Sequence, residues 1–321
     1  MKPIFLLLTF SLTAFLGYAQ VKSGITIELH DSSRNRPVTI AYWAPSDAGT
    51  ADQQVGIGAV DPAKHHIVLL SHGTGGNRFS LSWLASSLVE QGFFVVSVEH
   101  YGNSSESIIP AYFLRYWERP LDISFVLDYL EQSEFKDRLD FSRVGMIGFS
   151  FGGYTSIALA GAVMDTELLF SNITDPKYER EIAIPELADL MQYVDDVDFS
   201  EAPDSLKDSR IAYFVALAPA WGLGFGSKEQ FKAIDRPLLI IGAEADEIAP
   251  VATNAAHYHQ LIHTSEYVLL EGDIGHYIFL PEGSALQKEQ LPVYFRDAEN
   301  IDRSAVHQRV VDEVIGFIAH N

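Results

Sequence analysis

Short, continuously apolar runs alternate along the chain with segments in which apolar residues recur at helical spacing. Parallel strands that are covered on both faces are apolar throughout, so the continuous runs predict such strands. Strands that alternate with helices are typical of an α/β protein whose mostly parallel sheet carries helices on both faces. Strands are predicted at 26–29, 38–43, 66–71, 93–98, 144–148, 211–218, 237–242 and 266–270, and helices at 81–91, 120–131, 151–162, 252–262 and 304–319.

Two segments depart from this alternation. Residues 47–64 are rich in Gly, Ala and Asp and predict a loop. Residues 164–209 are acidic, contain three prolines and are longer than a simple connection between a helix and a strand. We expect them to form an insertion with short helices of its own, including one at 184–194, that could cover the site as a lid. A surface excursion away from the site is the alternative.

Residues 1–19 have the layout of a secretory signal peptide. Lys2 supplies the positive charge, residues 4–18 are mostly apolar, and Gly17 and Ala19 are the small residues of a cleavage site before Gln20. The apolar run is shorter than the roughly 20 residues of a membrane-spanning helix. We therefore expect a secreted or periplasmic protein without stable membrane insertion, in which residues 20–321 form a single domain.

Composition excludes several kinds of chemistry. The chain has 22 Lys and Arg residues against 43 Asp and Glu, a formal net charge of −21, which disfavours nucleic-acid binding. It has no cysteine, so a thiol nucleophile, a disulfide, an iron–sulfur cluster and a lipid-anchoring cysteine are all excluded. The His and Asp residues show no metal-ligand spacing. Neither a metal nor a cofactor is predicted.

One motif points to a nucleophilic serine. Residues 148–152 read Gly-Phe-Ser-Phe-Gly, which fits G-x-S-x-G and lies between a predicted strand and a predicted helix. On such a turn the hydroxyl of Ser150 points away from the sheet, and the flanking glycines let neighbouring backbone come close. The alternative is a tight glycine-rich turn with a structural serine. We expect Ser150 to be the nucleophile.

A nucleophilic serine needs a base, and the base needs a carboxylate that orients it. His276 lies in a turn-rich loop after the last predicted strand, at the carboxyl edge where such sheets carry their sites. Asp246 lies in the loop after the preceding strand, with Glu244 and Glu247 as alternative acids. The chain order Ser150, Asp246, His276 is the Ser–acid–His order of one large hydrolase fold.

The negative charge that develops on a reacting carbonyl oxygen needs two backbone N–H donors. We expect one from Phe151, the residue after the serine, and the other from Thr74 in the glycine-rich loop 71–76. This loop does not predict a phosphate site, because the lysine of a phosphate loop is missing. Trp221 follows the strand predicted at 211–218 and is the candidate wall of an acyl pocket.

Five polar residues near the glycine-rich loop need separate interpretations. His72 stands at a strand end, where a structural role is expected. Glu99 and His100 end another central strand and could line the pocket. Arg119 and Asp122 lie at a helix start, and we expect them to form a structural pair.

These motifs together resemble those of the α/β-hydrolases. Within that superfamily the chain is most similar to the bacterial predicted dienelactone hydrolases, a group related to platelet-activating-factor acetylhydrolases and polyester-cleaving cutinases. The resemblance spans residues 36–320 and is carried by His-Gly-Thr-Gly-Gly at 72–76, Trp-Glu-Arg-Pro-Leu-Asp at 117–122, Gly-Phe-Ser-Phe-Gly-Gly at 148–153, Ala-Leu-Ala-Pro-Ala-Trp at 216–221, Asp246 and His276.

The chain departs from these relatives in two ways. Dienelactone hydrolases proper use a cysteine nucleophile, which this chain lacks, so the family name says little about the substrate. In the plasma acetylhydrolases the acid precedes an Ala-Trp pair, whereas here Pro219 precedes Ala220 and Trp221. The acid is therefore expected at the next strand end, which favours Asp246.

The resemblance implies an α/β-hydrolase fold and a serine carboxylic-ester hydrolase that works through an acyl-enzyme intermediate. Because Trp221 is bulky and the segment 164–209 is acidic, we expect short-acyl, neutral, small-molecule esters as substrates. A lipase, a phospholipase or a lactonase would use the same residues, and a non-catalytic binding protein on the same fold is a remote alternative. The residues do not determine the natural substrate or the oligomeric state.

Overall fold

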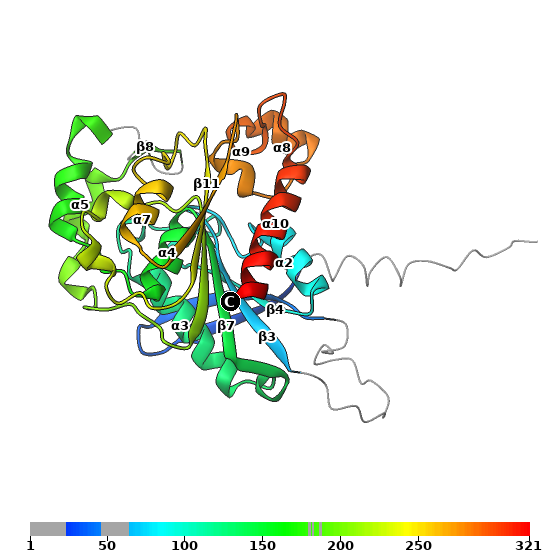
Figure 1. Ribbon diagram of the computed structural model, residues 1–321. Helices are drawn as coiled ribbons and strands as arrows, with labels where there is room; N and C mark the ends of the chain where they lie inside the picture. The colour runs from blue at the N-terminus through cyan, green and yellow to red at the C-terminus, as the bar shows by residue number, and fades with distance from the viewer. Residues whose placement is uncertain (1–23, 46–63, 179–180, 182, 186–187) are drawn as a thin grey trace, which may run out of the picture.

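A mostly parallel sheet of eight strands runs through the middle of the protein (Figure 1). The computed structural model describes residues 24–45, 64–178, 181, 183–185 and 188–321. The signal peptide expected at 1–19 and nearly all of the loop expected at 47–64 lie outside the described residues. In spatial order the strands are β1 (Ile25–Asp31), β2 (Arg36–Trp43), β4 (Phe94–Glu99), β3 (His65–Ser71), β7 (Leu139–Phe149), β10 (Ile211–Leu217), β11 (Leu238–Ala243) and β12 (Ser265–Leu270).

The strands follow the apolar pattern of the sequence. Every residue of β4 and of β11 is buried, as expected for strands covered on both faces. Strand β1 lies at the edge, alternates between half-buried and exposed residues, and pairs antiparallel with β2. From β4 to β12 all neighbouring strands are parallel. The predicted α/β fold class is confirmed.

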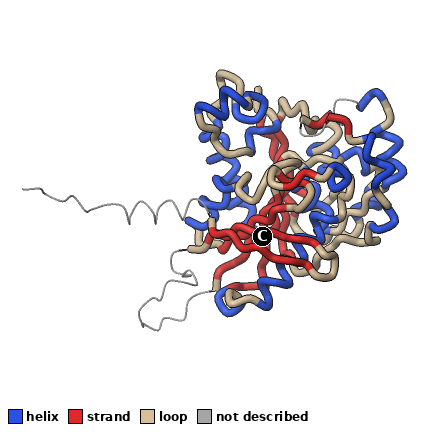
Figure 2. The backbone as a smooth tube through the Cα atoms, turned by 180° about the vertical axis from the view of Figure 1, so that it is seen from behind, coloured by secondary structure: helices blue, strands red, loops and turns tan. Residues whose placement is uncertain are grey.

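Helices cover both faces of the sheet and close a separate apolar core on each (Figure 2). On one face, Val126, Tyr154 and Tyr258 pack against the sheet from three different helices. On the other face, Leu88 and Val314 are buried in the second core. The helices of the first face are α3 (Glu118–Gln132), α4 (Phe151–Ala160) and α7 (Ala255–Leu261), and those of the second are α2 (Ser82–Glu90) and α10 (Arg303–His320).

The described residues of the segment 164–209 form an excursion beyond the sheet, and the helix predicted at 184–194 is wrong. A short hairpin occupies the start of that range, and a 3₁₀ helix follows it. Pro185 lies in the turn of the hairpin, where its fixed φ and missing N–H favour a turn over a helix interior. The elements are α5 (Thr166–Ile173), η3 (Pro176–Tyr178), β8 (Ala183–Ile184), β9 (Ala188–Asp189), η4 (Met191–Asp196) and η5 (Phe199–Glu201).

A second excursion, which the sequence did not predict, separates η8 (His276–Phe279) from α10. It contains α8 (Ala285–Gln290) and α9 (Pro292–Phe295). Figure 1 shows α5 and β8 on one side of the upper end of β11, and α8 and α9 on the other side. The two excursions therefore flank the carboxyl edge of the sheet. No helix in the described part of the chain is long and apolar enough to cross a membrane.

Candidate active site

Ser150 occupies a strained turn between β7 and α4. Its φ of 56° and ψ of −116° place a non-glycine residue at positive φ. The turn is so tight that a Cβ at Gly148 would lie 1.8 Å from the carbonyl oxygen of Gly152. A Cβ at Gly152 would lie 2.1 Å from the carbonyl oxygen of Ser71. Both glycines of the motif are thus required by close backbone contacts.

The structure brings Ser150, His276 and Asp246 into one hydrogen-bonded series. His276 Nε2 lies 2.9 Å from Ser150 Oγ, and His276 Nδ1 lies 2.6 Å from Asp246 Oδ2. All three residues are buried, with exposed fractions of 4 to 6%. A serine hydroxyl on an imidazole that is itself oriented by a carboxylate is an arrangement suited to nucleophilic attack.

The loop after β11 determines which of its three acids reaches the histidine. Asp246 turns inward, and its second oxygen accepts hydrogen bonds from the amides of Ile248 at 2.9 Å and Ala249 at 2.7 Å. These bonds fix the carboxylate plane toward His276. Glu244 and Glu247 are exposed. The structure thus brings Asp246, and neither alternative acid, to His276.

A cavity of about 90 Å³ lies against Ser150, and most of its lining residues are apolar. Trp221 is one wall: it adopts a left-handed conformation with φ of 67°, and its ring centroid lies 5.2 Å from that of Phe151. Described residues of the segment 164–209 form another wall. They are Leu169, Ile173, Glu181 and Leu190.

The cavity also contains a carboxylate that the sequence did not predict. Glu181 Oε2 accepts hydrogen bonds from Thr253 Oγ1 at 2.9 Å and Asn254 Nδ2 at 3.0 Å. Burial raises the pKa of Glu181, and the nearby charge of Asp246 contributes in the same direction. No local pattern could have revealed this contact, because its partners are more than 70 positions apart in the chain.

Thr74 and Phe151, the two expected oxyanion donors, both lie near the serine. Thr74 lines the cavity together with Ser150. The loop passes so close to the turn that a Cβ at Gly73 would lie 3.2 Å from Ser150 Cβ. Phe151 is the first residue of α4, whose N-terminal amides point toward the turn.

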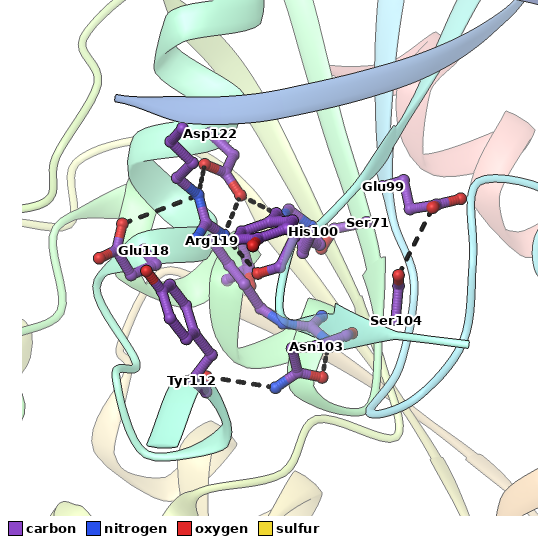
Figure 3. Close-up of polar contacts among 12 residues, drawn as sticks. Ser71, Glu99, His100, Asn103, Ser104, Tyr112, Glu118, Arg119 and Asp122 are labelled. Atoms are coloured by element: carbon purple, nitrogen blue, oxygen red, sulfur yellow. Dashed lines mark hydrogen bonds and ion pairs between the residues drawn. The ribbon is translucent and has the colours of Figure 1, made fainter. Parts of the chain in front are cut away.

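A buried polar network lies behind the glycine-rich loop (Figure 3). Ser71 Oγ lies 2.8 Å from His100 Nε2, and His100 Nδ1 lies 3.0 Å from Asp122 Oδ2. Arg36 donates two hydrogen bonds to Asp122, at 2.7 and 2.9 Å. The network therefore contains a second Ser–His–Asp series, but the structure gives all three of its residues exposed fractions of 0%.

Charge in this network is fixed by burial and ion pairing. Burial alone would raise the pKa of Asp122, but the Arg36 guanidinium beside it holds that pKa well below its usual range. Burial, together with the charge of Arg119, lowers the pKa of His100 to about 4. At neutral pH the network thus holds an ionised Asp122 and an uncharged His100.

One expectation about this region is wrong, and one possibility that the sequence left open is not realised. Arg119 and Asp122 do not form the expected pair: Asp122 pairs with Arg36, while Arg119 donates to backbone carbonyls of the glycine-rich loop. Glu99 and His100 are not among the residues that line the cavity. Glu99 pairs with Arg78 instead. Sequence spacing places residues on the same helix turn, but it cannot tell which distant strand supplies the opposite charge.

The described ranges contain no cluster of three or more His, Asp or Glu side chains that could hold a metal ion.

The chain is similar in sequence to known hydrolases. A family model described as "Alpha/beta hydrolase family" matches residues 67–285. Cutinase 2 of Thermobifida cellulosilytica is 25% identical over 211 residues, which are 64% of this chain and 58% of that protein. Cutinase cut1 of Thermobifida fusca is 25% identical over 211 residues, or 64% of this chain and 48% of that protein. The chain thus spans about half the length of these curated relatives.

Solved structures share the fold at low sequence identity. The ferulic acid esterase of Streptomyces cinnamoneus superposes with a TM-score of 0.58 at 16% identity, covering 92% of this chain and 88% of that one. Est1E of Butyrivibrio proteoclasticus gives a TM-score of 0.52 at 13% identity, covering 92% and 100%. At these identities the likeness establishes the fold alone.

Proposed function

The chain belongs to the alpha/beta hydrolase family, and on this premise we propose that it is an exported serine hydrolase of carboxylic esters. The observation that carries the proposal is the buried series of Ser150, His276 and Asp246 beside a mostly apolar cavity. The names of the curated relatives, which are cutinases, support an ester as the substrate.

In the proposed mechanism Ser150 Oγ attacks the ester carbonyl while His276 Nε2 takes its proton. Asp246 holds the imidazole in place and stabilises its positive charge. The amides of Thr74 and Phe151 donate to the tetrahedral oxyanion. His276 then protonates the departing alkoxide, which leaves an acyl-enzyme. Water then attacks the acyl group while His276 takes its proton, and the carboxylic acid is released from Ser150. No cofactor takes part.

We propose that the acyl group is short and uncharged. Trp221 and described residues of the 164–209 segment line the cavity of about 90 Å³, and these contacts support a lid role for the segment. Anionic acyl groups are disfavoured by Glu181, the cavity's own carboxylate. From sequence, the same preference is expected from five acids of the segment: Asp189, Asp195, Asp196, Asp198 and Glu201. The last four are exposed and do not line the cavity.

The first prediction concerns the three catalytic groups. Ser150→Ala and His276→Ala should each lower kcat/KM for p-nitrophenyl acetate by several orders of magnitude, because the residues act as a unit. Asp246→Asn should cost about 10⁴-fold through loss of imidazole orientation. A fluorophosphonate probe should label Ser150 in the wild type. The matched controls Glu244→Gln and Glu247→Gln should be nearly neutral. A severe loss in Glu244→Gln with a tolerated Asp246→Asn would show that the acid is misassigned.

The second prediction concerns acyl length. Each methylene that the cavity cannot accept forfeits roughly 1 kcal/mol of burial, so kcat/KM should fall steeply beyond butyryl. Trp221→Ala should move the optimum toward longer acids, whereas Trp221→Phe, which keeps an aromatic wall, should shift it little. The measurement is kcat/KM for p-nitrophenyl esters from two to twelve carbons. A wild-type profile that rises to the longest ester and ignores Trp221→Ala would favour a lipase instead.

The third prediction concerns export. We propose that residues 1–19 direct secretion and are removed, because their charge, apolar run and small residues match a cleavable signal. N-terminal sequencing of the protein recovered outside the cytoplasm should begin at or near Gln20. A product that keeps residues 4–18 and sediments with membranes would contradict cleavage.

A further inference from the structure

A second hollow opens beside the acyl cavity, a groove of about 510 Å³ between the glycine-rich loop and the α8–α9 excursion. It shares Thr74, Phe149 and Tyr277 with the acyl cavity, so the two hollows are continuous at the site. The groove is the larger of the two hollows. One wall of the groove is the α8–α9 excursion, which follows His276 in the sequence. The acyl cavity is instead lined by residues of α5.

The walls of the groove suit an uncharged ligand with an aromatic or apolar body. Five aromatic rings line it, together with Leu291 at its rim. Among its described lining residues, Glu282 is the one acidic or basic side chain, and Lys288 pairs with it. The five aromatic residues are Phe79, Phe149, Tyr277, Tyr294 and Phe295.

The groove begins next to His276. The ring of Tyr277 lies 5.2 Å from the ring of His276 and nearly perpendicular to it, and 4.7 Å from the ring of Tyr294. In the proposed mechanism His276 must protonate the leaving alkoxide, so the alcohol has to lie within reach of this ring. A large alcohol placed there would extend over Tyr277 into the groove.

We propose that the groove binds the alcohol part of the substrate, so that the preferred esters join a short acid to a bulky, uncharged alcohol with an aromatic or apolar body. This inference rests on the proposed function. It divides the substrate between two hollows of unequal size: the smaller limits the acid, and the larger provides contact area for the alcohol.

The test varies the alcohol at constant acid. Wild-type enzyme is assayed by pH-stat on methyl, benzyl and 2-naphthylmethyl acetate, which all release aliphatic alkoxides, and kcat/KM should rise with alcohol size. Leu291→Asp places a charge at the groove rim and should lower the naphthylmethyl-to-methyl ratio roughly tenfold. The same variant should gain activity on an acetate ester of a quaternary-ammonium alcohol. The control is Leu286→Asp, because Leu286 is 59% exposed on α8 and does not line the groove; its ratio should match the wild type.

The outcomes separate the inference from the proposed function. An active enzyme whose alcohol ratio is unchanged by Leu291→Asp would overturn the groove assignment alone. A variant that instead shifts the acyl-length profile would show that the groove holds the acid, which also overturns it. A wild-type enzyme that hydrolyses none of these esters would overturn the proposed function, and this inference with it.

Arg119 is a cation buried directly behind the glycine-rich loop (Figure 3). Its guanidinium donates to the carbonyl of His72 and, at 3.1 Å, to the carbonyl of Gly73. It also donates to Asn103 Oδ1 at 2.8 Å, and that oxygen accepts the amide of Gly75 at 3.3 Å. One side chain thus holds most of the loop.

The Gly73 carbonyl is the important contact, because it belongs to the same planar peptide as the Thr74 N–H. Besides Arg119, His72 Nδ1 lies 2.7 Å from this oxygen. The other His72 nitrogen accepts the amide of His100 at 3.2 Å, which leaves Nδ1 as the donor. Donors that fix the oxygen also fix the direction of the N–H, and a cationic donor polarises the peptide.

Arg119 contacts the second donor residue as well. Its guanidinium carbon lies 4.3 Å from the centroid of the Phe151 ring. We infer that Arg119 is a positioning residue that aligns the Thr74 and Phe151 amides on the oxyanion. This role also rests on the proposed function, but it is independent of the groove.

Its test compares two equally buried arginines. Arg119→Met should lower kcat about 100-fold with KM changed less than threefold, since the loss of one oxyanion donor has an effect of this size. Arg119→Lys, which keeps the charge without the planar fork, should recover only part of the loss. A boronic acid forms a tetrahedral adduct on serine, so its affinity should fall together with kcat. An analogue of the substrate that cannot react with serine forms no such adduct, and its affinity should stay unchanged.

The matched control is Arg36→Met, because Arg36 contacts Asp122 and the Tyr101 carbonyl rather than the loop. It should lower the melting temperature at least as much as Arg119→Met but leave kcat of the folded enzyme near the wild-type value. If both variants reduce kcat equally at matched stability, Arg119 is merely structural. If Arg119→Met does not fold, Arg119→Lys decides: a kcat and a boronate affinity equal to wild type would overturn the role.

Discussion

The close approach of two backbone segments determines the site: the turn at Ser150 lies directly against the loop that follows β3. Strand pairing brings them together, because Ser71 is opposite Gly148 in the parallel register of β3 and β7. The contact is possible only without side chains, as the 2.1 Å separation of a Gly152 Cβ from the Ser71 carbonyl oxygen shows. The positive φ of Ser150 is held in place by this packing rather than by its own local preference.

The same contact explains why so much charge is buried beneath the loop. A segment of glycines has few apolar side chains with which to anchor itself, so its position depends on hydrogen bonds to its carbonyls. Arg119 supplies these bonds from α3, and Asp122, one turn further along the helix, is neutralised by Arg36. Buried ions are costly unless every partner is present, so the arrangement tolerates little displacement. The glycine-rich loop is therefore expected to be rigid.

The sequence predicted those features that depend on local pattern. Continuous apolar runs identified the strands, and the residues expected at Ser150, Asp246 and His276 each follow a strand end, where chain order and topology bring them to one edge. Contacts between distant segments could not be predicted in this way. The helices α8 and α9 have only six and four residues, and Pro292 begins the second, so they are too short to give a periodic signal. The Arg36–Asp122 and Glu181–Asn254 contacts join residues more than 70 positions apart.

The buried series Ser71, His100 and Asp122 has a consequence for how hydrolases are recognised from coordinates. A geometric template of a hydroxyl, an imidazole and a carboxylate at hydrogen-bond distance would match this protein twice. The two matches differ only in their surroundings: one serine ends a regular strand and is sealed, and the other occupies a strained turn beside a cavity. Template searches that ignore backbone conformation and solvent access would therefore report a false site here. The reactivity of such a series depends on the backbone conformation of the serine and on its access to a cavity, and not on the three side chains alone.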